Sequence, residues 1–597
     1  MAVLLGAWLT GSSAETCLSD ETAFLQRRDD LVEDSQEDWI RWGRYRKLFK
    51  DNGMNYDLRN YTDEDGTVYL PWMFSKTLEH DPKTGFAKKS DIDLVLAAET
   101  DPTLDNVESI VLSSNTVRKL EGLTTTRNRN DLGKPPQLVE YPFFYEIDTE
   151  ESAFEMAEVY CQALLRDVAF FDYGSDSKAA LCIQELNKFS SKTSAPTNAN
   201  GMIDAQTLFR GPNPGELEGP YMSQFLVKSF RYGNLEIDQK YVVEEDPNNM
   251  LTMAGWLQVQ NGEVPTGIVT NGKAFASNGR VLGSMVHRDP LYQFYYNAAL
   301  LALQQGISTD GLHLTATSAW TTTGPPDVFA AVGHVALGAL RTAWWQKWGI
   351  YMRIRPEVYA KRYELARKHP ELVSEVPGLA NLKAHIEKAD LLIEEVLKEN
   401  ELASGVETAL LDMQYPEGSP THPSLPAGHA VVAGACVTVL KAMLKTFDDD
   451  KATIETKWVT GSRTAWHSID GQTLVEYTEP DSSEMTVNGE LNKLASNVAL
   501  GRDFAGVHYR ADGDGGILAG EDYAISYLAD KLKSYREADK QYQLFDGWVL
   551  QKFDGTVVRI THKGAEPLSK HDVYSRENQR KGWLRRLRAK LAPKEHD

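Results

Sequence analysis

Basic side chains in three short motifs of the second half of the chain have the types and spacing of an anion site. Lys347 and Arg355 lie in "KWGIYMRIRP", His429 follows "LPAG", and Arg502 and His508 lie in "GRDFAGVHYRAD". Arginine binds oxyanions through paired hydrogen bonds, and lysine adds a point charge. A histidine can attack or ligate the central atom. The motifs therefore predict a site for a tetrahedral oxyanion, whereas a divalent-cation site would favour carboxylates or thiolates.

The start of an apolar helix is the expected receiving point for this anion. The stretch "EGSPTHPSLPAGHAVVAGACVTVLKAML" passes from polar residues into apolar helix formers, and the join lies at Ala427, Gly428 and His429. Unpaired backbone N–H groups and the positive end of the helix dipole favour an anion there. Small residues allow the backbone to approach it closely. A second histidine, His422, precedes His429 by seven positions.

Two further elements must position the other side chains. On one continuous helix, Lys347 and Arg355 would point within about 80° of each other. That helix, beginning near "DVFAAVGHVALGAL", must stop near Pro356 because proline cannot continue it. Arg502 and His508 would diverge on an ideal helix, so a bend or helix end is expected at the glycine of "DFAGVH", residue 506.

Each of these residues, taken singly, is more often a surface group or a satisfied core group than part of a site. The ordered combination of K-x7-R-P, P-A-G-H and G-R-x5-H-x3-D on helices favours a common site over that interpretation.

Apolar residues at helical spacing predict a mainly α fold, a helical bundle with a few short β-hairpins. "ESAFEMAEVYCQALLRDVAFF" and "DPLYQFYYNAALLALQQG" are two such helices, and "YVVEED" and "TGIVTNGK" indicate a small hairpin region within 240–285. The predicted organisation is a polar N-terminal extension (1–145), an N-terminal helical half (146–330), a catalytic helical half (331–560) and a basic tail (561–597).

Composition excludes several classes of protein. The 597-residue chain carries a formal net charge of -22, which disfavours a nucleic-acid partner. No apolar run is long enough for a transmembrane helix. The start, "MAVLLGAWLTGSSAE", is either a short signal sequence without its basic residues or a trimmed terminus. Secreted, periplasmic, cell-wall-associated and soluble intracellular locations all stay open. Of the four cysteines, Cys436 is expected in the core, and Cys161 and Cys182 could pair if the chain is exported.

With these motifs, the chain resembles the vanadium-dependent haloperoxidases of the red-algal bromoperoxidase type, which share a superfamily with helical bacterial acid phosphatases. The resemblance covers most of residues 150–560, including "LFRGPNPGELEGPYMSQF", "HRDPLYQFYYNAALLAL", the helix-mouth stretch and "GELNKLASNVALGRDFAGVHYRAD". It implies vanadate as cofactor, hydrogen peroxide and bromide or iodide as substrates, small organic acceptors, and a homo-oligomer.

The resemblance also implies roles for individual residues. Vanadate oxygens would be bound by Lys347, Arg355, Arg502 and the backbone N–H of Gly428. His508 would ligate vanadium, His429 would be the acid–base group, and His422 would tune proton transfer near the peroxide. Lys347 would also polarise a peroxide oxygen. Weaker expectations place Asp512 and Asp289 as orienting groups for His508 or the arginines, and Trp344 and Trp345 either on the halide side or in the core.

Ala427 departs from the family pattern, which has serine at this position. The missing hydroxyl removes one donor to the oxyanion, and a hydrogen bond to a charged group contributes roughly 1.5–3 kcal/mol. Weaker vanadate binding is therefore expected rather than loss of the site. Three alternatives remain: a phosphatase acting through a phosphohistidine at His508, an iodide-only peroxidase, and a non-enzymatic helical storage or assembly protein.

Overall fold

The computed structural model describes residues 57–126 and 143–568, apart from 246–247, 266, 313–315, 449–451, 540 and 542–543. The signal-like start and most of the basic tail lie outside the described residues. From Asp57 onward the chain forms one compact unit. The expected boundaries at 145, 330 and 560 stay predictions.

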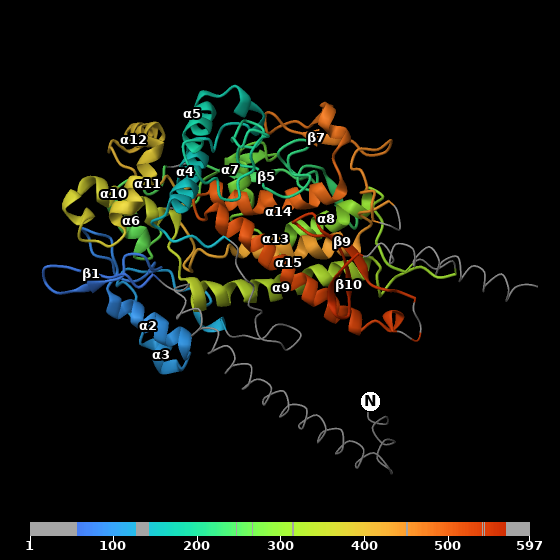
Figure 1. Ribbon diagram of the computed structural model, residues 1–597, viewed down its shortest axis with the longest axis horizontal. Coiled ribbons are helices and arrows are strands. Elements are labelled where there is room, and N and C mark those ends of the chain that lie inside the picture. The colour runs from blue at the N-terminus through green and yellow to red at the C-terminus, as the bar shows by residue number, and fades with distance from the viewer. Residues whose placement is uncertain are drawn as a thin grey trace, which may run out of the picture. The chain divides into compact units, whose positions relative to one another are not determined.

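Helices are the predominant regular elements of the structure, with strands far fewer, which confirms the predicted mainly α fold (Figure 1). The α-helices are α2 (Lys89–Thr100), α3 (Leu104–Glu108), α4 (Glu150–Leu164), α5 (Ser177–Leu186), α6 (Met253–Gln260), α7 (Gly279–Met285), α8 (Gln293–Gln304), α9 (Pro325–Gln346), α10 (Pro356–Lys368), α11 (Leu379–Ile386), α12 (Asp390–Ser404), α13 (Gly428–Met443), α14 (Val487–Phe504) and α15 (Arg510–Lys533).

The strands are short and form small antiparallel sheets. Two-stranded pairs join β1 (Tyr61–Thr62) to β2 (Val68–Tyr69), β3 (Phe230–Tyr232) to β4 (Leu235–Ile237), β5 (Tyr241–Glu244) to β6 (Thr270–Ala274) and β7 (Ala465–His467) to β8 (Val475–Tyr477), and a three-stranded sheet holds β9 (Trp548–Gln551), β10 (Val557–Thr561) and β11 (Gly564–Pro567). The pair β5–β6 lies in the predicted hairpin region, but α6 is inserted between the two strands, so it is not a hairpin.

The core is built around α13. Every residue of this helix except His429 is buried, because small and β-branched apolar side chains cover its whole circumference. α13 packs against α15, α9 and α14, and these four helices lie together in Figure 1. Gly434 and Gly520 permit the close approach of α13 and α15, since a Cβ added at either would lie about 2 Å from backbone of the other helix. The start of α13 is thereby fixed between three helices.

The segment between Lys347 and Arg355 differs from the predicted continuous helix. α9 ends at Gln346, a single π-helical turn, η3 (Lys347–Tyr351), follows, and Met352 adopts a left-handed conformation with φ 45°. Residues 353–355 are not helical, and Pro356 begins α10 instead of ending α9. Proline is well suited to a first helical position, because its missing N–H has no partner there anyway. The angle expected for a continuous helix therefore does not apply.

The predicted break near residue 506 is confirmed. α14 ends at Phe504, Gly506 has φ +81°, and α15 begins at Arg510. This left-handed glycine reverses the chain direction. His508 therefore lies in the turn between the two helices, where its side chain can face back toward Arg502.

A disulfide joins Cys161 in α4 to Cys182 in α5, and Cys436 is a buried free thiol, as expected for a core residue. Within the described ranges, no helix combines the length and the apolar character needed to cross a bilayer.

Candidate functional site: an anion pocket at the start of α13

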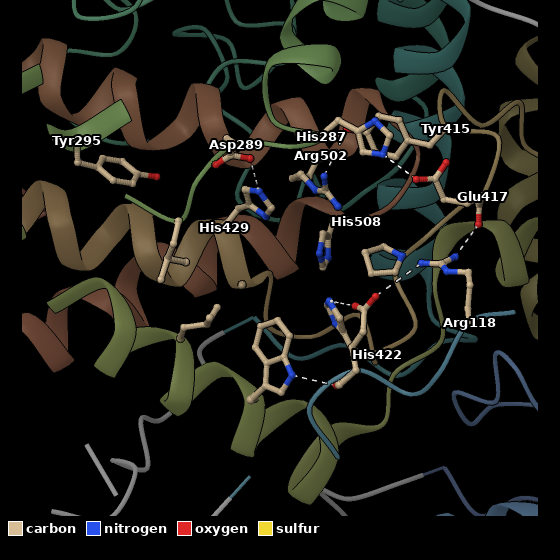
Figure 2. A pocket seen from close by; sticks show the side chains of 17 residues that line it. Arg118, His287, Asp289, Tyr295, Tyr415, Glu417, His422, His429, Arg502 and His508 are labelled. Carbon is tan, nitrogen blue, oxygen red and sulfur yellow. Dashed lines mark hydrogen bonds and ion pairs between the residues drawn. The ribbon is translucent and has the colours of Figure 1, made fainter. Parts of the chain in front are cut away.

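A pocket of about 380 Å³ opens beside the first turn of α13 (Figure 2). Its walls come from the segment before η1 (Leu123–Thr125), the loop after α7, α8, the end of α9, the loop leading into α13, the first turn of α13, the end of α14 and the turn before α15. The lining residues are Arg118, Glu121, His287, Asp289, Leu291, Tyr295, Leu340, Trp344, Tyr415, Glu417, Gly418, Pro420, His422, Gly428, His429, Arg502 and His508.

His508 presents one ring nitrogen as an acceptor. Its Nδ1 lies 2.9 Å from Oδ2 of Asp512, and its Nε2 lies 2.9 Å from Nη1 of Arg355. A guanidinium can only donate, so Nε2 accepts and Nδ1 carries the hydrogen that Asp512 accepts. Asp512, wholly buried, is itself held by Arg353 at 3.0 Å and by the hydroxyl of Ser424. The lone pair of Nε2 is therefore oriented before any ligand arrives.

Arg355 joins the two histidines that flank the pocket floor. Besides His508, its Nη2 donates to Nδ1 of His422 at 3.0 Å and to the His422 carbonyl at 2.8 Å. Its Nη1 also donates to the Val507 carbonyl at 2.7 Å. Arg355 is completely buried, directly beneath the lining residues. Its guanidinium thus fixes both histidines by hydrogen bonds.

Lys347 lies below the same loop. Its Nζ donates to the carbonyl oxygens of Pro423 and Ser424, each at 2.8 Å, which leaves one N–H of the ammonium group. The ammonium also lies 5.7 Å from the centre of the Trp344 ring. The π-helical turn brings Lys347 under residues 422–424. The sequence predicted a regular helix here, so a local irregularity, and not a regular helix, positions the Lys347 side chain.

Backbone donors at the start of α13 have no side-chain cap. Ala427 is the N-cap residue, and no side chain accepts a hydrogen bond from the first turn. The first N–H groups of a helix have no acceptor within the helix. A Cβ added at Gly428 would lie 3.0 Å from the ring of Trp344. The helix mouth is therefore narrow and rich in donors, which suits an oxyanion.

His429 is paired with Asp289, and this corrects the expected role of Asp289. Nε2 of His429 lies 2.9 Å from Oδ1 of Asp289, so the carboxylate orients His429 and neither His508 nor an arginine. Burial alone would raise the pKa of Asp289, but His429 and Arg502 hold this pKa below its ordinary value. Asp289 therefore remains an acceptor, and Nδ1 of His429 is the nitrogen left to exchange a proton. Asp512, by contrast, orients His508 as expected.

Arg502 reaches the pocket from α14. Its Nη1 donates to the Val286 carbonyl at 2.6 Å and approaches the Tyr415 hydroxyl at 3.4 Å. Its Nε, although buried, has no hydrogen-bond partner among the described residues. An unpaired buried donor of this kind is costly unless a ligand accepts from it.

Positive charge is concentrated in a space that water barely reaches. Burial, followed by repulsion from Arg355, lowers the pKa of Lys347 well below its ordinary value. Burial and the neighbouring Arg355 and Lys347 likewise lower the pKa values of His422 and His508. An anion in the pocket would reverse these shifts by supplying the missing counter-charge. The donor set therefore fits a tetrahedral oxyanion such as vanadate.

The predicted site residues are brought together. His422, Gly428, His429, Arg502 and His508 line the pocket, and Lys347, Arg355 and Ala427 lie buried against it. Trp344 also lines it, whereas Trp345 is buried and is not among the lining residues.

Several residues of the pocket were not predicted from the sequence. His287 is held between Glu244 at 2.8 Å and Glu417 at 2.9 Å, and its ring stacks 3.6 Å from that of Tyr415. Figure 2 shows His287 and Tyr415 on the Arg502 side of the pocket. Arg118 donates from Nη1 to the Glu417 carbonyl at 2.9 Å, and the Glu121 carboxylate lies 3.9 Å from Nη2 of Arg118. His287 and Glu417 lie in stretches that carry the family resemblance, but the sequence did not assign them to the site, because long-range contacts bring them to the pocket. Arg353, which holds Asp512, was also missed, although its position two residues before Arg355 in "RIRP" could have indicated it.

No family model matches the sequence. Similarity to individual proteins is extensive. A vanadium-dependent bromoperoxidase of Ascophyllum nodosum is 31% identical over 431 residues, which are 69% of this chain and 73% of that protein. Those of Corallina pilulifera and Corallina officinalis are 29% and 28% identical, covering 72% and 85% of this chain and 77% and 94% of theirs.

A solved structure shares the fold. The homohexameric second vanadate-dependent bromoperoxidase of Ascophyllum nodosum aligns with a TM-score of 0.76 and 24% identity, covering 94% of each chain. The similarity to these three bromoperoxidases spans 69–85% of the chain. The chain belongs to the family of the vanadium-dependent bromoperoxidases.

Proposed function

We propose that the chain is a vanadate-dependent bromoperoxidase. The observation that carries the proposal is the buried cluster of Lys347, Arg355, Arg502 and His508 at the uncapped start of α13, in a chain of this family. Bound vanadate would act as a Lewis acid that withdraws electrons from hydrogen peroxide. The reaction is H₂O₂ + Br⁻ + H⁺ → HOBr + H₂O: bromide loses two electrons, peroxide gains them, and one proton is consumed.

The chain's own residues would hold the anion and move protons. Arg502, the remaining N–H of Lys347 and the N–H of Gly428 would donate to its oxygens. Arg355 would join them by exchanging its hydrogen bond to Nε2 of His508, and this Nε2 would then be the ligand to vanadium. Nδ1 of His429 would accept a proton from peroxide, because Asp289 occupies the other nitrogen. The remaining N–H of Lys347 would polarise the oxygen that the halide attacks. His422 would tune proton transfer beside that oxygen.

Further proposals concern the halide, the organic acceptors, the assembly and the location of the protein. Bromide is the proposed halide, with iodide also oxidised because it loses electrons more readily, and the hypohalous acid would halogenate small organic acceptors. The homohexameric relative supports a homo-oligomer. The disulfide between α4 and α5 supports folding in an oxidising, exported compartment.

The test is reconstitution of apoprotein with orthovanadate in phosphate-free buffer. Peroxide-dependent bromination should appear with vanadate, and phosphate should compete because it is a tetrahedral oxyanion of similar size. The rival activity, phosphate-ester hydrolysis through a phosphohistidine at His508, is measured on the same apoprotein. Hydrolysis without any vanadate-dependent bromination would favour the phosphatase.

A further inference from the structure

Helix α4 carries two buried carboxylates that contact the start of α15, next to the turn that holds His508. Glu155 and Glu158 are three positions apart on α4, so their side chains leave the same face of the helix. Glu155 is wholly buried and Glu158 is 3% exposed. Neither belongs to the three motifs of the site, and neither lines the pocket. A buried carboxylate is costly unless it accepts hydrogen bonds, so the partners of each one indicate what it holds in place.

Glu155 joins Arg353 to the first turn of α15. Its Oε2 accepts from Nη2 of Arg353 at 3.3 Å, and its Oε1 accepts from the backbone N–H of Ala511 at 2.9 Å. The Arg353 guanidinium also lies over the Tyr509 ring, 4.4 Å from its centre. Both oxygens of Glu155 therefore face groups that can only donate.

Arg353 transmits this constraint to Asp512. Nη1 of Arg353 donates to Oδ1 of Asp512 at 3.0 Å, while Oδ2 of Asp512 accepts from Nδ1 of His508 at 2.9 Å. With one guanidinium nitrogen on Glu155 and the other on Asp512, Arg353 is shared between two carboxylates and neutralises each of them only in part. Asp512 therefore keeps more negative charge for the N–H of His508 than it would as the sole partner of Arg353.

We propose that Glu155 is a positioning residue for His508 and acts through Arg353 and Asp512. By holding Nη2, Glu155 prevents Arg353 from turning both nitrogens onto Asp512, so Asp512 stays a strong acceptor for Nδ1–H of His508. A strong acceptor at one ring nitrogen fixes the ring and makes the other a better electron donor, here Nε2 at the pocket. The effect on a bound anion rests on the proposed function, whereas the effect on the hydrogen bond at Nδ1 does not.

Glu158 provides a matched control on the same helix. It too pairs with a buried arginine of α15, because its Oε2 accepts from Nε of Arg510 at 2.8 Å. The other partners of Arg510 are Asp514 at 3.4 Å and the Arg210 carbonyl at 3.0 Å. Asp514 follows Asp512 by two positions and so faces nearly the opposite side of α15. Substitution of Glu158 removes a comparable buried pair between α4 and α15 without acting on Asp512.

The first measurement uses the apoprotein. The ring N–H proton of His508 is observed by NMR in protein labelled with ¹⁵N-histidine and is assigned by its absence in His508→Gln. In Glu155→Gln the amide has one acceptor oxygen where two are needed, so the hydrogen bond at Nδ1 should weaken and the resonance should move upfield. Glu155→Met, an apolar residue without a strong acceptor, should show the same shift. Glu158→Gln and Glu158→Met should keep the wild-type resonance.

The second measurement is equilibrium dialysis of the apoproteins with orthovanadate. Loss of a group that holds a metal ligand typically weakens binding by about 10–100-fold. Because Glu155 acts at one further remove, its two variants should raise the dissociation constant by roughly tenfold, the lower end of that range. The Glu158 variants should bind as the wild type does, although the melting temperature should fall in both sets.

A double-mutant cycle tests the path through Arg353. If Glu155 acts through Arg353, Glu155→Met should add little to the dissociation constant of Arg353→Met, because the two substitutions break the same chain of contacts. Fully additive effects would show that Glu155 acts through the N–H of Ala511 instead, and would overturn the proposed path.

Two further results would overturn the inference. One is a wild-type His508 resonance in the folded Glu155 variants. The other is an equal change of the resonance, or of the orthovanadate dissociation constant, in the Glu155 and Glu158 variants, which would indicate a general loosening of the contact between α4 and α15. A wild type that neither binds orthovanadate nor oxidises bromide would refute the proposed function, while the resonances of the apoproteins would still decide the role of Glu155.

Discussion

Ala427 occupies the helix-mouth position at which the sequence resemblance predicts a serine. It is fully buried, and as N-cap of α13 it leaves the first turn without a side-chain acceptor. In Ala427→Ser the new hydroxyl should donate to a bound oxyanion and tighten orthovanadate binding, by at most about 3 kcal/mol for a charged hydrogen bond. Activity at limiting vanadate should rise with it. Titration of orthovanadate into both apoproteins gives the two dissociation constants.

A second effect of serine must be separated from the first. A serine N-cap can also accept from the backbone of the first turn, which stabilises helices by about 1 kcal/mol. A higher melting temperature with an unchanged vanadate dissociation constant would assign the hydroxyl to capping, and the missing-donor explanation would fail. Ala427→Cys serves as control, because the thiol is a far weaker donor.

The two pocket histidines should respond differently to substitution. Nε2 of His508 is an oriented acceptor at the pocket floor, whereas His429 is paired with Asp289 at the side. His508→Ala should therefore lose activity and most orthovanadate binding. His429→Ala should lose turnover to a greater extent than binding. Equilibrium dialysis with orthovanadate, alongside bromination assays, distinguishes them, and equal affinity in wild type and His508→Ala would reassign the ligand.

At the scale of elements, His287 connects the loop after α7 with β5 and with the loop before α13. Burial would lower the pKa of His287, but Glu244 and Glu417 raise it above the ordinary 6.5. Burial would raise the pKa of Glu417, but His287 lowers it from 4.5 to about 2. The histidine's contribution to stability is complete below pH 6.5 and is lost as pH rises through its folded pKa. The glutamate's contribution is complete above pH 4.5 and is lost as pH falls toward 2.

His287→Gln should therefore lower the melting temperature most between about pH 4.5 and 6.5. Scanning calorimetry at pH 3, 5.5 and 9 measures the difference from wild type at each pH. A difference of the same size at all three values would show that the pair contributes through packing on Tyr415 and not through charge.

The disulfide between α4 and α5 should stabilise the fold. It closes a loop with a sequence separation of 21, for which the loss of chain entropy in the unfolded state amounts to about 3 kcal/mol. The double variant Cys161→Ser, Cys182→Ser should melt at a lower temperature. Reductant should lower the melting temperature of the wild type but not of the variant, and an equal response in both would contradict a disulfide in solution.

Elements that follow from local patterns could be predicted, and irregular ones could not. Apolar periodicity predicted α4 and α8, the apolar stretch after Gly428 predicted α13, and the glycine at 506 marked the break before His508. The predicted end of α9 near Pro356 was wrong. The π-helical turn at Lys347 depends on packing beneath residues 422–424 and has no sequence signature. The contact between Asp289 and His429, and the approach of Glu121 to His422, join residues far apart in the chain, so only the folded structure reveals them.

At the scale of the whole molecule, the central claim is that a tetrahedral oxyanion occupies the space between α13, α14 and the turn at His508. Although the chain carries a net charge of -22, the buried side chains of Lys347, Arg355 and Arg502 gather at this one pocket. The pocket lies inside the compact unit that begins at Asp57, so its geometry depends on the packing of the entire helical core.

The most direct measurement is a crystal structure of the protein with orthovanadate, in which anomalous scattering locates the vanadium. We expect one strong vanadium peak within bonding distance of Nε2 of His508, with the oxygens facing Arg355, Arg502, Lys347 and the N–H of Gly428. A peak on another histidine, or an empty pocket at a vanadate concentration that supports bromination, would contradict it.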